Sequence, residues 1–371
     1  MKVLWVFNHP APYKVDFFNE LGKKCELTVL FERPSESDRN PAFYYEKAIN
    51  FKCRILKSLI LGRCNNWTRE VVHVIKREHF DIIVMNGYST FTEMNAIRYL
   101  QDKKIPYIFA INGGLIRQSE SGLRRYLKKK YISKAALYLA PDPNSAEYLK
   151  FYGAQADLIR LYPYSTIFDK EVLGSPITPS QQEAFRKKEG LPCKRLYVSV
   201  GQFISRKNNF SLLEHWKTMP QTSTLLMVGN GPEKKDYEKF ILENKLNNVV
   251  IKDYEPHKKI LSLFQMADFS IFLTKEDIYG HVVNEALSQG TPVIASTKAN
   301  SALNLIEDGK NGYLVNLDNN DDIVSALNHE PNELLRLGAI ETAKKNTIET
   351  MKEELIAPSF SSLVNVTLPP T

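Results

Sequence analysis

The sequence predicts an α/β protein with two doubly wound domains, each built on a mainly parallel sheet. Short apolar, β-rich runs alternate with longer amphipathic segments along all 371 residues, which is the pattern of repeated βαβ units. A Pro-containing stretch over residues 162–179 interrupts the alternation once, and the pattern then starts again. We therefore expect one domain over residues 1–168, a second over 169–348, and a C-terminal helix and tail over 349–371 that packs back on the first domain.

In the first half, apolar runs predict strands and amphipathic segments predict helices. The expected strands cover residues 3–7, 26–31, 81–85, 107–111 and 137–140. The expected helices cover residues 15–23, 67–77, 92–102 and 123–133. Residues 33–65 are rich in Pro, Ser, Asn and charged side chains, so we expect an irregular excursion there.

The second half repeats this alternation more regularly. The expected strands cover residues 196–200, 224–228, 249–251, 269–273, 293–295 and 313–315. The expected helices cover residues 210–217, 233–243, 258–266, 281–288, 303–307 and 321–327. In the tail we expect a helix that ends near residue 356 and then an extended segment.

The composition is that of an ordinary globular protein. Hydrophobic residues make up 43% and charged residues 25%, which excludes collagen-like, coiled-coil and wholly disordered chains. No apolar run approaches the ~20 residues needed to cross a bilayer, and the N-terminal run turns polar at Asn8, so we expect a cytoplasmic protein. Cys25, Cys53, Cys64 and Cys193 lack the spacing of a zinc site, so we expect reduced, mostly buried thiols and no metal site.

Positive charge is concentrated in the first domain. The formal net charge is +7, but residues 1–168 carry a balance of +10 and residues 169–371 one of −3, so the first domain should face an anionic partner. Cations interleaved with apolar side chains gather on one expected helix and at its end: Arg124, Arg125, Lys128, Lys129, Lys130 and Lys134. This pattern fits an anionic membrane surface or a solvated charged face, and both alternatives stay open. No nucleic-acid module accompanies it, so we expect no nucleic-acid partner.

The stretch most informative about chemistry follows the strand expected at residues 269–273. Gly280 permits a tight turn or a close backbone approach, and the residues after it have helical spacing. The start of a helix offers amides and the positive end of a dipole to phosphate. Glu285 follows His281 by about one turn, where a carboxylate can accept both hydroxyls of a ribose, and Asp277 is placed to reach a sugar beyond the phosphates. The alternative is that both acids are ordinary helix acids.

Two further turns complete the pattern. After the strand expected at residues 196–200, Gly201 and Gln202 lead to Arg206 and Lys207, whose adjacent cations can neutralise a diphosphate. The alternative is that they are ordinary surface cations. A Gly-x-Gly-Pro turn begins at Gly229, which is a weak signal alone because such turns close many strands.

Together these elements resemble the retaining glycosyltransferases of family 4, also called group 1, which have the GT-B fold of two Rossmann-like domains facing each other across a cleft. The family's Glu-x7-Glu motif has the form Glu-Pro-Phe-Gly, four residues, then Glu-Ala. Here residues 277–280 and 285–286 occupy that spacing. Residues 290–295 and 308–315 resemble two further family landmarks, and residues 8–13 and 111–114 resemble the first loop and the loop that faces the transferred sugar.

The resemblance implies roles residue by residue. The implied catalytic residues are Asp277, Glu285, Arg206 and Lys207. The implied donor-binding residues are Gly201, Gln202, Arg206, Lys207, Gly229, Asp277, Ile278, Tyr279, Gly280, His281, Val282 and Glu285. Those implied to face the sugar or the acceptor are Asn112, Gly113, Tyr13 and Arg117. Gln202 stands where many members have Arg, Asn112 where many have His, and Glu276 beside Asp277 leaves open which acid meets the sugar.

In function, the resemblance implies transfer of a sugar from a UDP- or GDP-sugar to a glycan or lipid-linked acceptor, with the anomeric configuration retained. It implies no obligatory metal and no cofactor. Together with the basic first domain, it leads us to expect surface polysaccharide biosynthesis at the inner face of the cell membrane. The alternatives are a sugar-nucleotide 2-epimerase or a phosphorylase of the same fold, and a non-catalytic nucleotide-sugar-binding scaffold.

Overall fold

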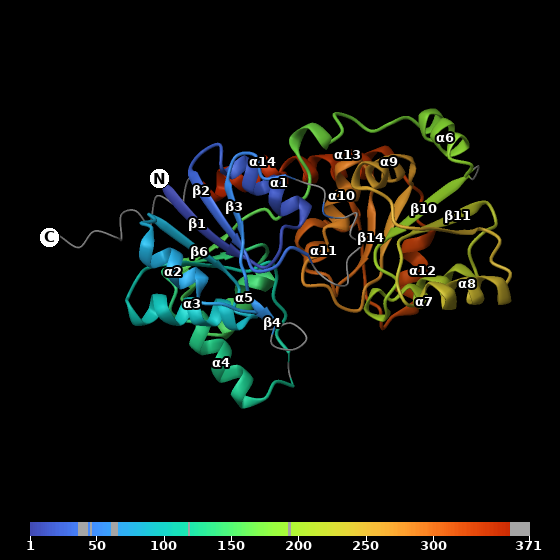
Figure 1. Ribbon diagram of the computed structural model, residues 1–371. Coiled ribbons are helices and arrows are strands. Elements are labelled where there is room, and N and C mark those ends of the chain that lie inside the picture. The colour runs from blue at the N-terminus through green and yellow to red at the C-terminus, as the bar shows by residue number, and fades with distance from the viewer. Residues whose placement is uncertain (36–43, 45–46, 61–65, 118, 192–193, 357–371) are drawn as a thin grey trace. The chain divides into compact units, whose positions relative to one another are not determined.

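The computed structural model describes residues 1–35, 44, 47–60, 66–117, 119–191 and 194–356 (Figure 1). The chain divides into two units, described here one at a time. The N-terminal unit comprises residues Met1–Tyr164 and the segment that starts at Ile348, and the C-terminal unit comprises Ser165–Thr347. The division thus falls four residues before the boundary expected at residue 168. The end of the expected tail, residues 357–371, lies outside the described residues.

The N-terminal unit is built on a seven-stranded parallel sheet in the order β3-β2-β1-β6-β7-β8-β9. Its strands are β1 (Lys2–Phe7), β2 (Glu26–Phe31), β3 (Lys52–Ile55), β6 (Ile82–Asn86), β7 (Ile108–Ala110), β8 (Leu137–Ala140) and β9 (Ile159–Leu161). The strand order runs outward in both directions from β1, so the topological switch point lies between β1 and β6. A separate antiparallel pair joins β4 (Leu59–Ile60) to β5 (Asn66–Trp67).

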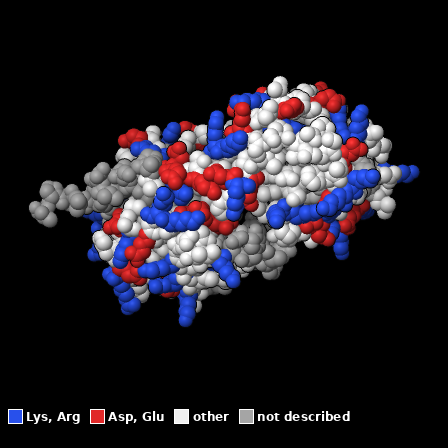
Figure 2. All heavy atoms as spheres, turned by 90° about the horizontal axis from the view of Figure 1, so that it is seen from above, with Lys and Arg blue, Asp and Glu red and all other residues white. Residues whose placement is uncertain are grey.

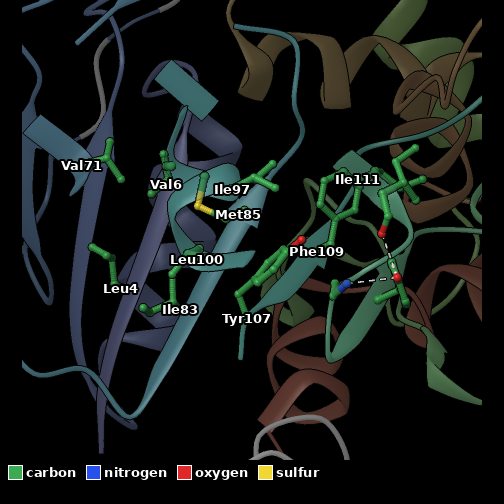
Figure 3. Close-up of a cluster of buried hydrophobic side chains, with 14 of the residues drawn as sticks. Leu4, Val6, Val71, Ile83, Met85, Ile97, Leu100, Tyr107, Phe109 and Ile111 are labelled. Carbon is green, nitrogen blue, oxygen red and sulfur yellow. Dashed lines mark hydrogen bonds between the residues drawn. The ribbon is translucent and has the colours of Figure 1, made fainter. Parts of the chain in front are cut away.

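Helices cover both faces of this sheet, so β1 is buried on both sides, as is usual for a central parallel strand. The helices are α1 (Pro12–Leu21), α2 (Glu70–Arg77), α3 (Phe91–Asp102), α4 (Gly122–Ile132), α5 (Pro143–Phe151) and α14 (Ile348–Leu355). Leu4 and Val6 join the core cluster drawn in Figure 3, with Met85 of β6 and Leu100 of α3. Trp5, which points to the opposite face, packs edge-on against Phe17 of α1. Helix α14 packs on α1 in the same unit.

The C-terminal unit repeats the design on a six-stranded parallel sheet in the order β12-β11-β10-β13-β14-β15. Its strands are β10 (Arg195–Val200), β11 (Ser223–Val228), β12 (Val249–Lys252), β13 (Phe269–Phe272), β14 (Val293–Ser296) and β15 (Gly312–Val315). Its helices are α6 (Pro179–Lys188), α7 (Asn209–Trp216), α8 (Lys234–Glu243), α9 (His257–Met266), α10 (Val282–Ser288), α11 (Asn300–Leu305), α12 (Asn320–Asn328) and α13 (Glu333–Lys344). Two apolar clusters fill the two faces of the sheet. The switch point lies between β10 and β13.

The expected strands are present in both sheets, but the irregular excursion expected at residues 33–65 was wrong in part. Strand β3 lies inside it and forms one edge of the N-terminal sheet. All four of its residues are exposed, so the segment has none of the apolar run that marks the central strands. Residues 36–43 and 61–65 of that stretch lie outside the described residues. Within the described chain, no helix combines the length and apolar character needed to cross a bilayer.

Candidate functional site

The candidate site lies in the C-terminal unit, at the carboxyl ends of β10 and β13. These neighbouring strands flank the switch point of the sheet, and the chain leaves them toward opposite faces, which opens a crevice where such sheets bind ligands. The loop after β10 contains the single-turn helix η4 (Ser205–Lys207), and the loop after β13 leads into α10. The two sequence motifs therefore meet at the edge where a ligand is expected.

Close backbone approach shapes the loop after β10. A Cβ atom on Gly229, in the turn after β11, would lie 1.9 Å from the carbonyl oxygen of Gly201, so a side chain at residue 229 would force the two turns apart. At the end of η4, Asn208 adopts a left-handed conformation with φ of 61° before α7 begins. This sharp reversal leaves Arg206 and Lys207 at the mouth of the sheet.

The loop after β13 depends on Gly280. Its φ of 99° disfavours any side chain, and a Cβ atom there would lie 2.7 Å from the ring of Phe272. The Ser301 hydroxyl donates to the Gly280 carbonyl at 2.8 Å, and the Asp277 amide donates to the Lys298 carbonyl at 3.0 Å. These bonds fix the path of residues 277–280 into α10.

The two loops bind each other directly. The Lys275 amide and the Thr274 hydroxyl both donate to the Arg206 carbonyl, at 2.8 Å and 2.9 Å. In return, Arg206 donates from Nη1 to the carbonyl of Glu276 at 3.1 Å. The cations of one motif and the acids of the other are therefore held by backbone contacts as well as by charge.

The centre of the site is an ion-pair cluster of two cations and one carboxylate. Asp277 Oδ2 accepts from Arg206 Nη1 at 2.8 Å and from Lys207 Nζ at 2.7 Å, and Lys207 also lies 4.5 Å from the centre of the Phe272 ring. Burial alone would raise the pKa of Asp277, but the charges and hydrogen bonds of Lys207 and Arg206 outweigh it and hold this pKa below its usual range. Asp277 is therefore ionised, and the cluster keeps one excess positive charge, with Arg206 43% exposed.

Glu285 lies on α10 and is held from two sides. Its Oε1 accepts from the Thr166 hydroxyl at 3.2 Å and lies 3.8 Å from Nδ1 of His257, at the start of α9. The side chain is 16% exposed, so it is not completely sealed from solvent. Neither Thr166 nor His257 was predicted from the sequence, because neither belongs to the spacing that identified Glu285.

The neighbouring residue of α10, Asn284, binds both segments that lead out of the C-terminal unit. Its amide donates to the Ser165 hydroxyl at 2.9 Å and to the Asn346 carbonyl at 2.8 Å. Since the unit begins at Ser165 and ends at Thr347, α10 fixes both ends of it while it carries Glu285. This role was not predictable from the sequence, since a buried Asn on a helix has no characteristic spacing.

The other residues predicted to bind the donor line the same loops. Tyr279 is buried, with its ring 5.1 Å from that of His281, whereas Ile278 is 49% exposed. Gln202 and Val282 are half-buried.

The four residues expected to face the sugar or the acceptor lie in the N-terminal unit. Asn112 and Gly113 follow β7, and Arg117 is exposed further along the same loop. The Oδ1 atom of Asn112 is buried and has no hydrogen-bond partner among the described residues. Tyr13 lies at the start of α1, and its hydroxyl accepts from that of Tyr164 at 3.4 Å. The structure therefore places Asn112, Gly113 and Arg117 on the loop after β7 and Tyr13 in the first turn of α1, which follows β1.

Over the described residues, no three His, Cys, Asp or Glu side chains gather closely enough to hold a metal ion. Cys25 and Cys53 are free thiols, and Cys53 is exposed, so the expectation of mostly buried cysteines was wrong for it. Cys64 and Cys193 lie outside the described residues.

The C-terminal unit also matches a known protein family. Residues 181–344 match the family model of glycosyl transferases group 1. The matched segment contains Arg206, Lys207, Asp277 and Glu285. The residues expected to face the acceptor lie outside it.

Curated relatives are glycosyltransferases of glycolipid, lipopolysaccharide and polysaccharide biosynthesis. The chain is 26% identical over 226 residues to the sulfoquinovosyl transferase SQD2 of Arabidopsis thaliana, a match covering 58% of this chain and 43% of that protein. It is 33% identical over 116 residues to the processive diacylglycerol alpha-glucosyltransferase of Acholeplasma laidlawii, covering 30% of this chain and 34% of that protein. In both matches, the chain spans less than half the length of the relative.

Solved structures cover almost the whole chain. HepE from Anabaena, in complex with UDP, superposes with a TM-score of 0.78 at 17% identity, covering 98% of this chain and all of that one. WaaG, a glycosyltransferase involved in lipopolysaccharide biosynthesis, superposes with a TM-score of 0.66 at 16% identity, covering 96% of this chain and all of that one. The fold is GT-B.

Proposed function

We propose that this chain is a retaining glycosyltransferase that moves a sugar from a UDP- or GDP-sugar to a glycan or lipid-linked acceptor in cell-envelope polysaccharide or glycolipid biosynthesis. The observation that carries the proposal is the cluster of Arg206, Lys207 and Asp277 at the switch point, with Glu285 on the helix that follows. This arrangement lies inside the segment that matches the group 1 family model. The complex of HepE with UDP-glucose supports a nucleotide-sugar donor.

In this proposal, Arg206 and Lys207 bind the diphosphate of the donor. Asp277 holds both cations in place before the donor arrives, at 2.8 Å and 2.7 Å. A diphosphate carries more negative charge than one carboxylate, so both side chains can turn toward it without leaving the cluster. Glu285 accepts the hydroxyls of the ribose, in part by exchanging its bond with the Thr166 hydroxyl.

The reaction breaks the bond between the anomeric carbon and the phosphate oxygen and forms a bond from that carbon to the acceptor oxygen on the same face. The acceptor proton passes to the leaving phosphate. Negative charge builds on the diphosphate as the bond breaks, so the fixed cations stabilise the transition state more than the ground state. Because these cations supply that charge, we propose that no metal ion is required, and activity should survive a chelator.

Ligand-induced stabilisation tests the donor site first. A nucleoside diphosphate that binds only the folded state raises the melting temperature with the logarithm of its concentration. UDP or GDP should do so for the wild type and for the control Glu243→Gln, on exposed α8, but much less for Glu285→Gln. Equal stabilisation of all three proteins would overturn the role of Glu285.

Activity assays with and without an acceptor then distinguish the transferase from the scaffold and the epimerase. Transfer to added glycan or lipid acceptors, with slow hydrolysis of the donor in their absence, supports the proposal. Tight donor binding with neither transfer nor hydrolysis favours the scaffold, and conversion of the donor sugar without an acceptor favours the epimerase. Inversion at the anomeric carbon would contradict the retaining mechanism.

A further inference from the structure

A cavity of about 890 Å³ lies at the amino-terminal edge of the C-terminal sheet, lined by residues of α6 and of the start of α13. Lys194, which precedes β10, and Asp268, which precedes β13, also line it. Because β10 and β13 are parallel, this edge is opposite to the one that carries Arg206, Lys207 and Asp277. The volume is in the range of small-molecule sites, ~300–1,000 Å³. The cavity is therefore separate from the proposed donor site.

Two buried guanidinium groups share one carboxylate beside this cavity. Asp268 Oδ2 accepts from Arg186 Nη2 at 2.8 Å, and Asp268 Oδ1 accepts from Arg336 Nη2 at 3.3 Å. Arg186 is 5% exposed and Arg336 is 6% exposed, and both line the cavity. Burial, together with the charge of Arg186, lowers the pKa of Arg336 although Asp268 opposes this. One positive charge is thus in excess where it is largely removed from water, which is costly unless an anion compensates it.

Arg336 also keeps one hydrogen-bond donor unused. Its Nη1 donates to the Gly290 carbonyl at 3.3 Å and its Nη2 to the Ala267 carbonyl at 2.9 Å. Its Nε donates to no described residue. Arg186, by contrast, donates from Nε to the Met266 carbonyl at 2.8 Å. The Nε of Arg336 is therefore a donor that a molecule in the cavity can use.

Further positive groups surround this pair. Lys187 and Lys194 line the cavity, are exposed, and form no ion pair with any described residue. Helices α6 and α13 both begin at the cavity, so the positive ends of two helix dipoles border it. Two exposed acids at the rim, Glu183 and Glu333, balance the lysines, which favours a compact anion over a polyanion.

Surface charge alone would not identify this site. On the face seen in Figure 2, Lys and Arg are interspersed with Asp and Glu. What distinguishes the cavity is the buried pair of arginines on a single carboxylate, together with a wall that is in part apolar. The apolar part of the wall consists of Pro176, Ile177 and Pro331.

We propose that this cavity binds a small organic phosphate, with its phosphate group on Arg336 Nε and the two rim lysines and its organic part against the apolar wall. A phosphate offers three oxygens to donors that come from different directions, whereas a carboxylate offers two in one plane. Arginine and lysine side chains both suit phosphate, the first as a planar fork and the second as a point charge. This second ligand site does not depend on the proposed transfer reaction, so either proposal can fail alone.

Calorimetric titration of the full chain with glycerol 3-phosphate, at constant ionic strength, tests the proposal. The wild type should bind it, and the rim variant, Lys187→Gln with Lys194→Gln, should raise Kd about tenfold or more, because two charge-assisted contacts are lost. The control, Lys188→Gln with Lys344→Gln, removes the same charge from exposed positions of α6 and α13 that do not line the cavity. This control should bind like the wild type.

A third variant separates this site from the donor site, whose cations can also attract phosphate. Lys207→Met should retain the binding of glycerol 3-phosphate. In a crystal structure with this ligand, a phosphate oxygen should lie within hydrogen-bond distance of Arg336 Nε.

Two further ligands test which part of the molecule is recognised. Inorganic phosphate should bind more weakly than glycerol 3-phosphate because it leaves the apolar wall unused, and succinate should bind more weakly because it carries only carboxylates. The proposal is overturned if the wild type does not bind glycerol 3-phosphate at millimolar concentration, if the rim variant binds like its control, or if Lys207→Met abolishes binding. It is also overturned if inorganic phosphate or succinate binds as tightly, or if the crystal structure places the phosphate elsewhere.

Discussion

At the carboxyl ends of β10 and β13, the C-terminal unit holds Arg206, Lys207 and Asp277 as ionised partners, with Arg206 43% exposed. The N-terminal unit has the same topology, but near the carboxyl ends of β1, β2 and β6 three of its ionisable groups are buried. Lys14 on α1 is fully buried, and so are Glu32 after β2 and Glu93 on α3. Arg206 of the C-terminal cluster therefore remains open to solvent, whereas the three N-terminal groups are removed from it.

The electrostatics of the N-terminal unit follow from this burial. Lys14 Nζ has no hydrogen-bond partner among the described residues and lies 4.3 Å from the centre of the Tyr164 ring, and burial lowers its pKa to about 7. Burial raises the pKa of both Glu32 and Glu93, and their proximity raises that of Glu32 further. At neutral pH much of the charge of these three groups is therefore suppressed.

The difference teaches that topology positions a crevice, whereas side chains decide what it binds. Two cations that share one carboxylate, one of them 43% exposed, suit a diphosphate, because it carries more negative charge than that carboxylate. At the corresponding edge of the N-terminal unit, the charge of the buried groups is suppressed, and the buried Oδ1 atom of Asn112 has no hydrogen-bond partner among the described residues. Such an edge suits a neutral ligand whose hydroxyl groups can donate to Asn112. Substitutions in each unit can test whether the C-terminal unit binds the donor and the N-terminal unit binds the acceptor.

The largest effect should come from removing a cation of the C-terminal cluster. Lys207→Met deletes the amine 2.7 Å from Asp277, so the donor loses a partner for the charge that builds on its diphosphate. We expect kcat/KM for transfer to fall by roughly 10²–10³, by analogy with the loss of one donor to a developing anion. Lys217→Met, at the exposed end of α7, serves as the control, and a loss no larger than in this control would contradict the role of Lys207.

Replacing Lys14 is expected to increase the stability of the protein by a large amount. Its lowered pKa means that the folded state disfavours the charged amine, so the wild type is destabilised at pH 7, and this cost shrinks as the pH rises toward the ordinary pKa of 10.5. Lys14→Met should therefore raise the free energy of unfolding by roughly 2–4 kcal/mol at pH 7 and by less at pH 10. Urea unfolding at both pH values measures this change in the free energy of unfolding, and the exposed Lys24→Met variant serves as the control. A destabilised variant would mean that Lys14 is a paired cation.

A smaller effect is expected at the carboxyl pair. Glu93 Oε2 accepts from the Thr90 amide at 3.1 Å in a capping box, and Gln keeps that acceptor. Because burial raises the pKa of Glu93 from the ordinary 4.5 to about 7 in the folded state, stability is lost as the pH rises from about 4.5 to about 7. Glu93→Gln should remove that loss, a gain of about 1–2 kcal/mol at pH 8 and almost none at pH 4.5. The control is exposed Glu78→Gln, and a gain independent of pH would refute the buried, protonated pair.

Much of the C-terminal unit could be predicted from the sequence because its strands are short, apolar and regularly spaced. The motif around Gly280 was also readable, since only glycine fits beside Phe272 at a φ of 99°. Strand β3 was missed because an exposed edge strand is held by main-chain bonds to β2 and needs no apolar run. Helix α5 was missed as well, although Asp142 caps its first turn.

The site itself was predictable only in part. Spacing along one segment identified Asp277 and Glu285, and local turns identified Arg206 and Lys207. That Asp277 would bind both cations depends on contacts across about seventy residues, which no local pattern carries. Thr166 reaches Glu285 over an even longer separation, and the burial of Lys14 follows from aromatic rings that assemble only on folding.

A crystal structure of the protein with bound UDP tests the central claim most directly. The account predicts the diphosphate within ion-pair distance of Arg206 and Lys207, and the ribose hydroxyls on the Glu285 carboxylate. A nucleotide bound elsewhere, or one whose diphosphate contacts neither Arg206 nor Lys207 and whose ribose does not reach Glu285, would contradict it.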